Sequence, residues 1–269
     1  MPPEEAPVAA YVPLWRRVGA SAGAAAARVG RALAAAYHAV DPDVRRNFAQ
    51  APLLGLARLV PARAGPAPVP DDGRRPVVFV HGLGGHPGDF WPMRGYFRLT
   101  GRRRTYAVAL PGGAPLEALG EQLATFVAAV AACNALPDGA RIDVVAHSMG
   151  GLVARLALED AAAAARVATL VTLGTPHAGT HLARWADTEH TRALRPGSPV
   201  VARLARQLPW AGPPALPRLV SFWSDADPLL LPASSARVEG ANNVELPGFT
   251  HVGYLLHPTA WRRVAEILA

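Results

Sequence analysis

The sequence predicts a single α/β domain built on a mainly parallel central sheet, with helices on both faces of that sheet. Short apolar runs typical of strands alternate with segments of helical periodicity over most of the chain. The run from Val77 to Val80 is apolar at every position, as in a strand buried on both faces. At 269 residues the chain can bury a substantial core and fits one such domain with additions better than two domains.

The expected elements alternate in type along the chain. Strands are predicted at residues 77–80, 105–110, 141–146, 168–173, 218–223 and 243–246, and helices at 115–133, 149–165 and 258–268. This alternation favours βαβ units, which place consecutive strands parallel to one another. No internal repeat is visible.

A Pro-rich stretch from Pro61 to Pro76 separates two parts of the chain. We expect residues 1–75 to form a helical arm with a linker, and residues 76–269 to form the main domain. Residues 20–39 predict an Ala-rich helix packed on the domain, and a peripheral membrane anchor with Trp15 at the lipid headgroups is the alternative. No signal peptide is recognisable, which favours a cytoplasmic or membrane-peripheral location over secretion. No uncharged apolar run is long enough to span a membrane.

The net charge of +7 does not predict a nucleic-acid partner. All 27 basic residues are arginines, and they are scattered rather than interleaved with stacking aromatic residues. Alanine and proline are also abundant, so the arginine content indicates a compositional bias. The one cysteine, Cys133, excludes an internal disulfide, and we expect a monomer.

The strongest local motif is Val144-Val145-Ala146-His147-Ser148-Met149-Gly150-Gly151. A buried strand runs into Ser148, small residues stand two positions to either side, and a helix follows, as in a nucleophile elbow. Such a turn needs small residues because larger side chains would collide with the neighbouring backbone. Ala146 stands where glycine is usual, and its single methyl group is sterically tolerable.

A second motif, His81-Gly82-Leu83-Gly84-Gly85, ends the first strand. Acyl transfer needs backbone N–H groups aimed at a developing oxyanion, and glycines let the backbone approach the substrate. We expect the amides of Leu83 and Met149 to be these donors, with His81 bracing the loop. A phosphate-binding loop is the weaker alternative, because no Gly-Lys-Ser/Thr follows.

We expect the general base, a histidine, and the carboxylate that orients it to lie on loops that follow strands. His251 follows the last predicted strand and is preferred to His257, which precedes Pro258 and the final helix. Asp227 is preferred to Asp225, because a proline and an apolar stretch follow it. The chain order of serine, aspartate and histidine is the one expected of this kind of site.

These motifs together resemble the α/β-hydrolase superfamily, and in particular the small bacterial triacylglycerol lipases and esterases that carry alanine in the elbow. The segments AHSMGG, SDADPLLLP, ELPGFTHVGYLL and LGTPHAGT carry the resemblance, which covers residues 76–269. It implies a pocket-wall role for His177. The minimal lipases lack both the N-terminal arm and an insert as long as 178–216, which we interpret as a cap over the site, with an inert loop as the alternative.

The sequence therefore predicts a serine carboxylic-ester hydrolase that needs no cofactor and no metal, acting on an acyl ester or lipid and contacting a lipid interface. The predicted pocket residues are His81, Gly82, Phe90, Trp91, His177, Leu229, Leu230 and Val252. A phospholipase, an acyltransferase and a polyester hydrolase use the same triad and are the alternatives, together with an inactive binding protein.

Overall fold

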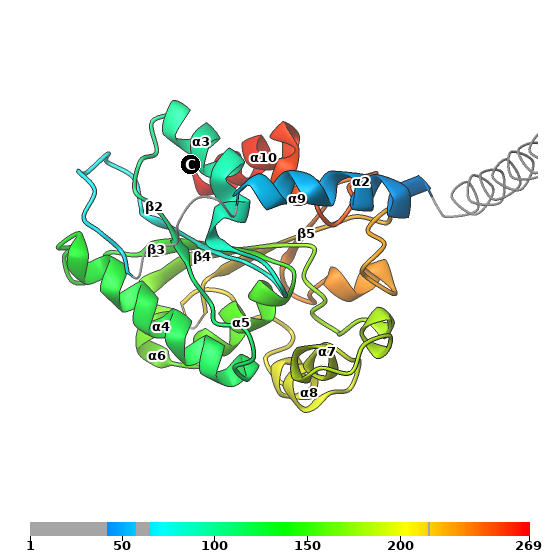
Figure 1. Cartoon of the computed structure of the whole chain (residues 1–269). Coiled ribbons are helices and arrows are strands. Elements are labelled where there is room, and N and C mark those ends of the chain that lie inside the picture. The colour runs from blue at the N-terminus through cyan, green and yellow to red at the C-terminus, as the bar shows by residue number, and fades with distance from the viewer. Residues whose placement is uncertain (1–41, 58–64, 215) are drawn as a thin grey trace, which may run out of the picture.

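Six parallel strands form the centre of the molecule (Figure 1). The structure is a computed structural model that describes residues 42–57, 65–214 and 216–269, so the predicted helix at 20–39 and Trp15 lie outside the described residues. In order across the sheet, the strands are β2 (Thr105–Val108), β1 (Val77–Val80), β3 (Ile142–His147), β4 (Val167–Leu173), β5 (Arg218–Trp223) and β6 (Asn242–Glu245). The predicted parallel sheet is confirmed.

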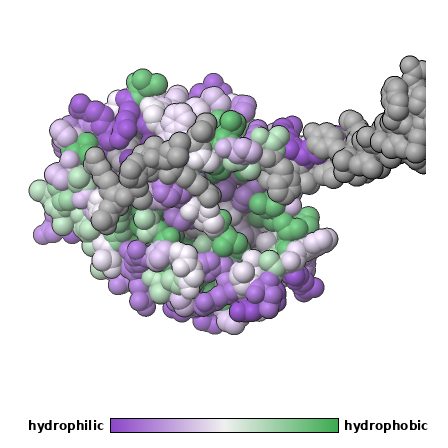
Figure 2. All heavy atoms as spheres, viewed as in Figure 1, coloured by the Kyte–Doolittle hydropathy of each residue, from purple (hydrophilic) through white to green (hydrophobic). Residues whose placement is uncertain are grey.

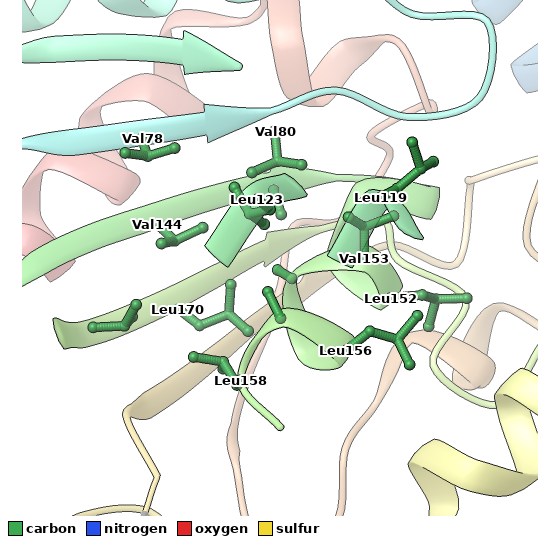
Figure 3. Close-up of a cluster of buried hydrophobic side chains, with 14 of the residues drawn as sticks. Val78, Val80, Leu119, Leu123, Val144, Leu152, Val153, Leu156, Leu158 and Leu170 are labelled. Atoms are coloured by element: carbon green, nitrogen blue, oxygen red, sulfur yellow. The ribbon is translucent and has the colours of Figure 1, made fainter. Parts of the chain in front are cut away.

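Side chains that alternate along each strand face two different layers of helices. Val78, Val80 and Val144 pack with α4 (Leu116–Cys133) and α5 (Met149–Ala157), as Figure 3 shows. Their neighbours Val77 and Phe79 pack on the other face, with α3 (Trp91–Leu99) and α10 (Pro258–Leu268). The continuous apolar run of β1 is therefore explained by burial on both faces.

Helix α4 is the one helix of the described residues that is long and apolar enough to cross a membrane. It packs on the sheet instead, with Leu119, Leu123 and Val127 buried in the core next to α5. Its composition therefore reflects its place in the core of the domain.

The predicted helix at 149–165 is two helices. Helix α5 ends at Ala157, and α6 (Ala161–Arg166) begins after Asp160, whose side chain accepts a hydrogen bond from the Ala163 amide. An aspartate at this position starts a new helix by satisfying a free N–H group. Several short helices of the described residues were not predicted, among them α3, α9 (Gly253–Leu256) and η1 (Pro87–Phe90), whereas α2 (Pro42–Ala57) lies within the arm that was expected to be helical. Proline or glycine lies within or at the start of α3, α9 and η1, which weakened the helical pattern.

A buried carboxylate ties the amino-terminal edge of the sheet to the end of the chain. Asp143 on β3 is fully buried and accepts hydrogen bonds from Arg102 Nη2 at 2.6 Å and Arg75 Nε at 3.1 Å. Arg102 also donates to the carbonyl oxygen of Leu268 at 3.0 Å. Burial raises the pKa of Asp143, and the two guanidinium groups oppose that shift.

Replacing Asp143 by alanine is expected to lower the free energy of unfolding by about 3–5 kcal/mol, because the Arg102 guanidinium would remain buried without its carboxylate. Urea denaturation measures this loss. Asp138→Ala is the matched control, since Asp138 is exposed and lies 3.8 Å from Arg166. A loss of less than about 1 kcal/mol for Asp143→Ala would contradict the expectation.

Candidate active site

Ser148 occupies a sharp turn between β3 and α5. Its backbone has φ 55° and ψ −130°, a conformation that residues other than glycine rarely adopt. The Ser148 amide donates to the Leu173 carbonyl oxygen at 2.9 Å, and the Ser148 carbonyl oxygen accepts from the Thr175 hydroxyl at 2.8 Å. The strained turn is therefore held from both sides by the end of β4.

Close packing explains the small residues around Ser148. A Cβ atom on Gly150 would lie 2.6 Å from the His81 carbonyl oxygen and 2.7 Å from that of Val80. A Cβ on Gly82 would lie 2.7 Å from the Cβ of Ser148, so the glycine loop directly adjoins the serine. Ala146 is fully buried in the core, where its methyl group fits.

Thr175 and Gly151 make a contact that the sequence analysis missed. A Cβ on Gly151 would lie 2.1 Å from the Thr175 hydroxyl oxygen, so only glycine lets Thr175 reach the Ser148 carbonyl. The second glycine of the pair Gly150-Gly151 and the threonine of LGTPHAGT were visible in the sequence. Their contact was not, because it joins helix α5 to the loop after β4, 24 residues further along the chain.

His251 and Asp227 form a buried pair next to this turn. His251 Nδ1 lies 2.8 Å from Asp227 Oδ2, and Asp227 Oδ1 accepts from the Leu229 amide at 3.0 Å. The alternatives lie elsewhere: Asp225 is exposed, and His257 caps α10 by accepting a hydrogen bond from the Thr259 amide.

Two other buried histidines are held by structural hydrogen bonds. His147 Nε2 donates to the His251 carbonyl oxygen at 2.9 Å. His177 Nε2 lies 3.0 Å from the Thr172 hydroxyl, and its Nδ1 lies 3.4 Å from Arg155 Nη1. Burial lowers the pKa of both histidines well below the usual value, assisted by His251 for His147 and by Arg155 for His177. Both rings therefore stay neutral in the folded protein at neutral pH.

Lowering the pH from 8 to 5 is expected to reduce the free energy of unfolding. Below about pH 6.5 these two histidines bind protons in the unfolded chain but not in the folded protein. Each histidine therefore lowers the free energy of unfolding by up to about 1.4 kcal/mol for each pH unit. Urea denaturation across this range measures the slope. His177→Gln should flatten it, whereas His181→Gln should leave it unchanged because His181 is exposed. Equal slopes for His177→Gln and the parent would contradict the assignment.

Ser148 and His251 line one cavity of about 370 Å³. The rest of its lining is mostly apolar and comes from α2, the glycine loop, the 176–194 segment and the loops after β5 and β6. In Figure 2, hydrophobic residues gather on the right of this face, between the parts that Figure 1 labels α2 and α7. The cavity can therefore accept an apolar chain beside a serine hydroxyl and an imidazole.

The predicted pocket residues divide into two groups. Gly82, Leu229, Leu230 and Val252 line the cavity, as does Leu83, one of the two predicted oxyanion donors. Other predicted site residues are not among its lining: His81, Phe90, Trp91, His177 and Met149.

Each residue of this second group has a different environment. Phe90 packs against Phe79 in the core, with ring centroids 4.9 Å apart. Trp91 is 55% exposed and lines a separate hollow beside Pro66. The Met149 side chain lies in the core, while its backbone begins α5. His81 braces the glycine loop by accepting from the Leu110 amide at 3.2 Å.

The 178–216 segment forms one wall of the cavity. It contains η2 (His181–Arg184), α7 (Glu189–Ala193) and α8 (Pro199–Ala205), and its Thr180, Leu182 and Leu194 line the cavity. Arg155 of α5 anchors the segment, donating to Gln207 Oε1 at 3.1 Å and to the Leu204 carbonyl oxygen. Burial lowers the Arg155 pKa to about 10.

Neither a second hollow nor a cluster of metal ligands offers a comparable candidate site in the described residues. A hollow of about 720 Å³ between α4, α5 and α6 is lined mainly by alanines and acidic residues and contains no histidine. No three His, Cys, Asp or Glu side chains are grouped as metal ligands within 42–57, 65–214 and 216–269.

Comparisons with known proteins confirm the resemblance to lipases. A family model described as "Domain of unknown function (DUF7379)" matches residues 120–212. A triacylglycerol lipase of Burkholderia plantarii is 33% identical over 144 residues, which are 49% of this chain and only 38% of that lipase.

Two solved structures share the fold at low sequence identity. The mature lipase BlEst2 of Bacillus licheniformis has a TM-score of 0.62 and 20% identity, over 76% of this chain and 96% of that one. Lipase B of Aspergillus fumigatus has a TM-score of 0.61 and 18% identity, over 76% of this chain and 55% of that one.

Proposed function

The chain has the α/β-hydrolase fold that its sequence predicts, and we propose that it is a serine carboxylic-ester hydrolase with Ser148, His251 and Asp227 as its catalytic triad. One observation carries the proposal. A serine on a strained strand-to-helix turn and a histidine bonded to a buried carboxylate line the same apolar cavity. This combination serves nucleophilic acyl transfer.

In the proposed reaction, His251 removes the proton of the Ser148 hydroxyl as Oγ attacks the ester carbonyl carbon. Asp227 accepts a hydrogen bond from His251 Nδ1–H, which leaves Nε2 as the base and stabilises the imidazolium that forms. The imidazolium then protonates the departing alcohol, and an acyl group remains on Ser148. Water, activated by the same histidine, releases the acid and restores the serine.

Two backbone amides are proposed to hold the oxyanion. Met149 is the first residue of α5, and an amide at this position has no acceptor within its own helix. The positive end of the helix dipole lies there as well, which favours a developing negative charge. Leu83 lies on the glycine loop, whose Gly82 packs against Ser148. Each such donor typically stabilises the transition state by about 3–4 kcal/mol.

The apolar lining and the lipase relatives favour a lipid or acyl ester as substrate. The first experiment is a series of nitrophenyl esters from acetate to palmitate, combined with labelling by a fluorophosphonate probe. We expect saturable hydrolysis and one label, found on Ser148 by mass spectrometry. A chain that hydrolyses none of these esters and takes up no label would refute the proposal, and would favour an inactive binding protein.

The alternatives on the same triad differ in substrate and acceptor. Triglyceride, phospholipid and polyester substrates, each tested with water and with an added alcohol as the acyl acceptor, separate lipase, phospholipase, polyester hydrolase and acyltransferase. We expect the triglyceride or simple ester with water to react fastest, since the B. plantarii relative is a triacylglycerol lipase. A preference for phospholipid would reassign the substrate class and keep the triad.

A further inference from the structure

Helix α2 belongs to the N-terminal arm, outside residues 76–269, yet it supplies part of the cavity wall. Ala51 and Leu54 line the cavity together with Ser148 and His251. In Figure 1, α2 crosses over the sheet on the side of α9 and α10. Nothing in the resemblance to lipases accounts for this helix, because the resemblance begins after it.

Two hydrogen bonds attach α2 to the loop that carries His251. The Thr250 hydroxyl donates to Gln50 Oε1 at 2.8 Å and accepts from the Gly253 amide at 3.2 Å. Arg46 Nη2 donates to the Gly248 carbonyl oxygen at 2.7 Å. Thr250 is 1% exposed, so its hydroxyl group has little access to water. Loss of the Gln50 acceptor would therefore leave a buried donor without its hydrogen bond, which is unfavourable.

Apolar packing adds to this attachment. Leu54 is half-buried and packs against the core cluster that contains Phe79 and Tyr254. Leu53, the preceding side chain, is 55% exposed and is not part of the cavity lining. The helix therefore directs one face toward the cavity and another toward solvent.

We propose that α2 is a size-selecting wall of the substrate cavity, with Leu54 and Ala51 limiting the length of the ester chain that binds beside the triad. This inference rests on the proposed ester hydrolase activity. The two residues act by volume. The Leu54 side chain occupies space that a longer chain would need, while Ala51 leaves space that a larger side chain would fill. In an apolar pocket, one methylene of substrate is worth about 10–200-fold in kcat/KM.

The test compares kcat/KM for nitrophenyl palmitate and nitrophenyl butyrate in the full chain and three variants. Leu54→Ala is expected to raise the palmitate-to-butyrate ratio by about tenfold, because it enlarges the cavity. Ala51→Trp is expected to lower the ratio by a similar factor, because it fills the cavity. Leu53→Ala is the matched control from the same helix and should leave the ratio within about twofold of the parent.

The variants work in opposite directions, so a general loss of stability cannot imitate the expected pattern. Ratios that stay within twofold in both Leu54→Ala and Ala51→Trp, with thermal melting showing folded protein, would overturn the role of α2. A change of the ratio in Leu53→Ala as large as in Leu54→Ala would overturn it as well. The proposed ester hydrolase activity is judged separately, by butyrate hydrolysis in the parent and fluorophosphonate labelling of Ser148.

Two variants of Gln50 extend the same experiment. Gln50→Leu removes the acceptor for the Thr250 hydroxyl, whereas Gln50→Glu retains one. If the bond holds the wall in place, Gln50→Leu should shift the palmitate-to-butyrate ratio and Gln50→Glu should restore it toward the parent value. Equal ratios in Gln50→Leu, Gln50→Glu and the parent would show that the bond does not hold the wall.

Discussion

Replacing Ser148 by alanine is expected to lower kcat/KM for ester hydrolysis by about 10⁴-fold or more. The hydroxyl is the proposed nucleophile, and no other described serine or threonine of the cavity lining occupies the turn that adjoins the glycine loop. The backbone would stay in place, because its hydrogen bonds to Leu173 and Thr175 use main-chain atoms of residue 148. Steady-state kinetics and a thermal melt close to that of the parent check both parts.

Ser148→Gly is the companion variant. Glycine adopts φ 55° without strain, so this variant should be more stable than Ser148→Ala by about 1–3 kcal/mol while being equally inactive. Denaturant unfolding measures the difference. Near-normal hydrolysis in either variant would refute the role of Ser148, and equal stability of the two would show that the turn is not strained.

Replacing Asp227 by asparagine is expected to lower kcat by about 10⁴-fold, the loss that follows when the aspartate of a Ser-His-Asp triad is replaced by asparagine. The amide is uncharged and can present an N–H group to His251 Nδ1, which would favour the tautomer that carries the proton on Nε2. The histidine could then no longer accept the serine proton. A pH–rate profile and steady-state kinetics measure the loss.

Asp225→Asn is the matched control, because Asp225 lies two residues away and is exposed. It should change kcat by no more than about twofold. Comparable losses in the two variants would mean that negative charge near the loop matters and not the bond to His251. Full activity in Asp227→Asn would remove Asp227 from the triad.

The sequence predicted the sheet well because each strand carries its own local signal. The apolar run at Val77–Val80 is confirmed as β1, and the predicted helix at 258–268 is α10. The prediction of one helix over 149–165 was wrong because alanines continue the helical pattern across Asp160, where the chain starts a new helix.

The site was predicted in part, again where the signal is local. Ser148 stands at a strand end between small residues, and its positive φ agrees with the interpretation of that motif as a sharp turn. The preference for Asp227 over Asp225 rested on the following proline and apolar stretch, and the structure has Asp227 bonded to His251. Phe90 was expected in the pocket as an apolar residue and His177 from the resemblance to lipases, but Phe90 lies in the core and His177 is held next to Thr172.

What the sequence by itself determined is the fold class, the succession of the six strands along the chain and the short motifs that point to Ser148, Asp227 and His251. Periodicity and turn chemistry act over a few residues, so they can be recognised without coordinates. Only the tertiary structure decided which distant segments share the cavity. The contact of Gln50 with Thr250 joins positions 200 residues apart, and such contacts depend on how helices and loops pack over the finished sheet.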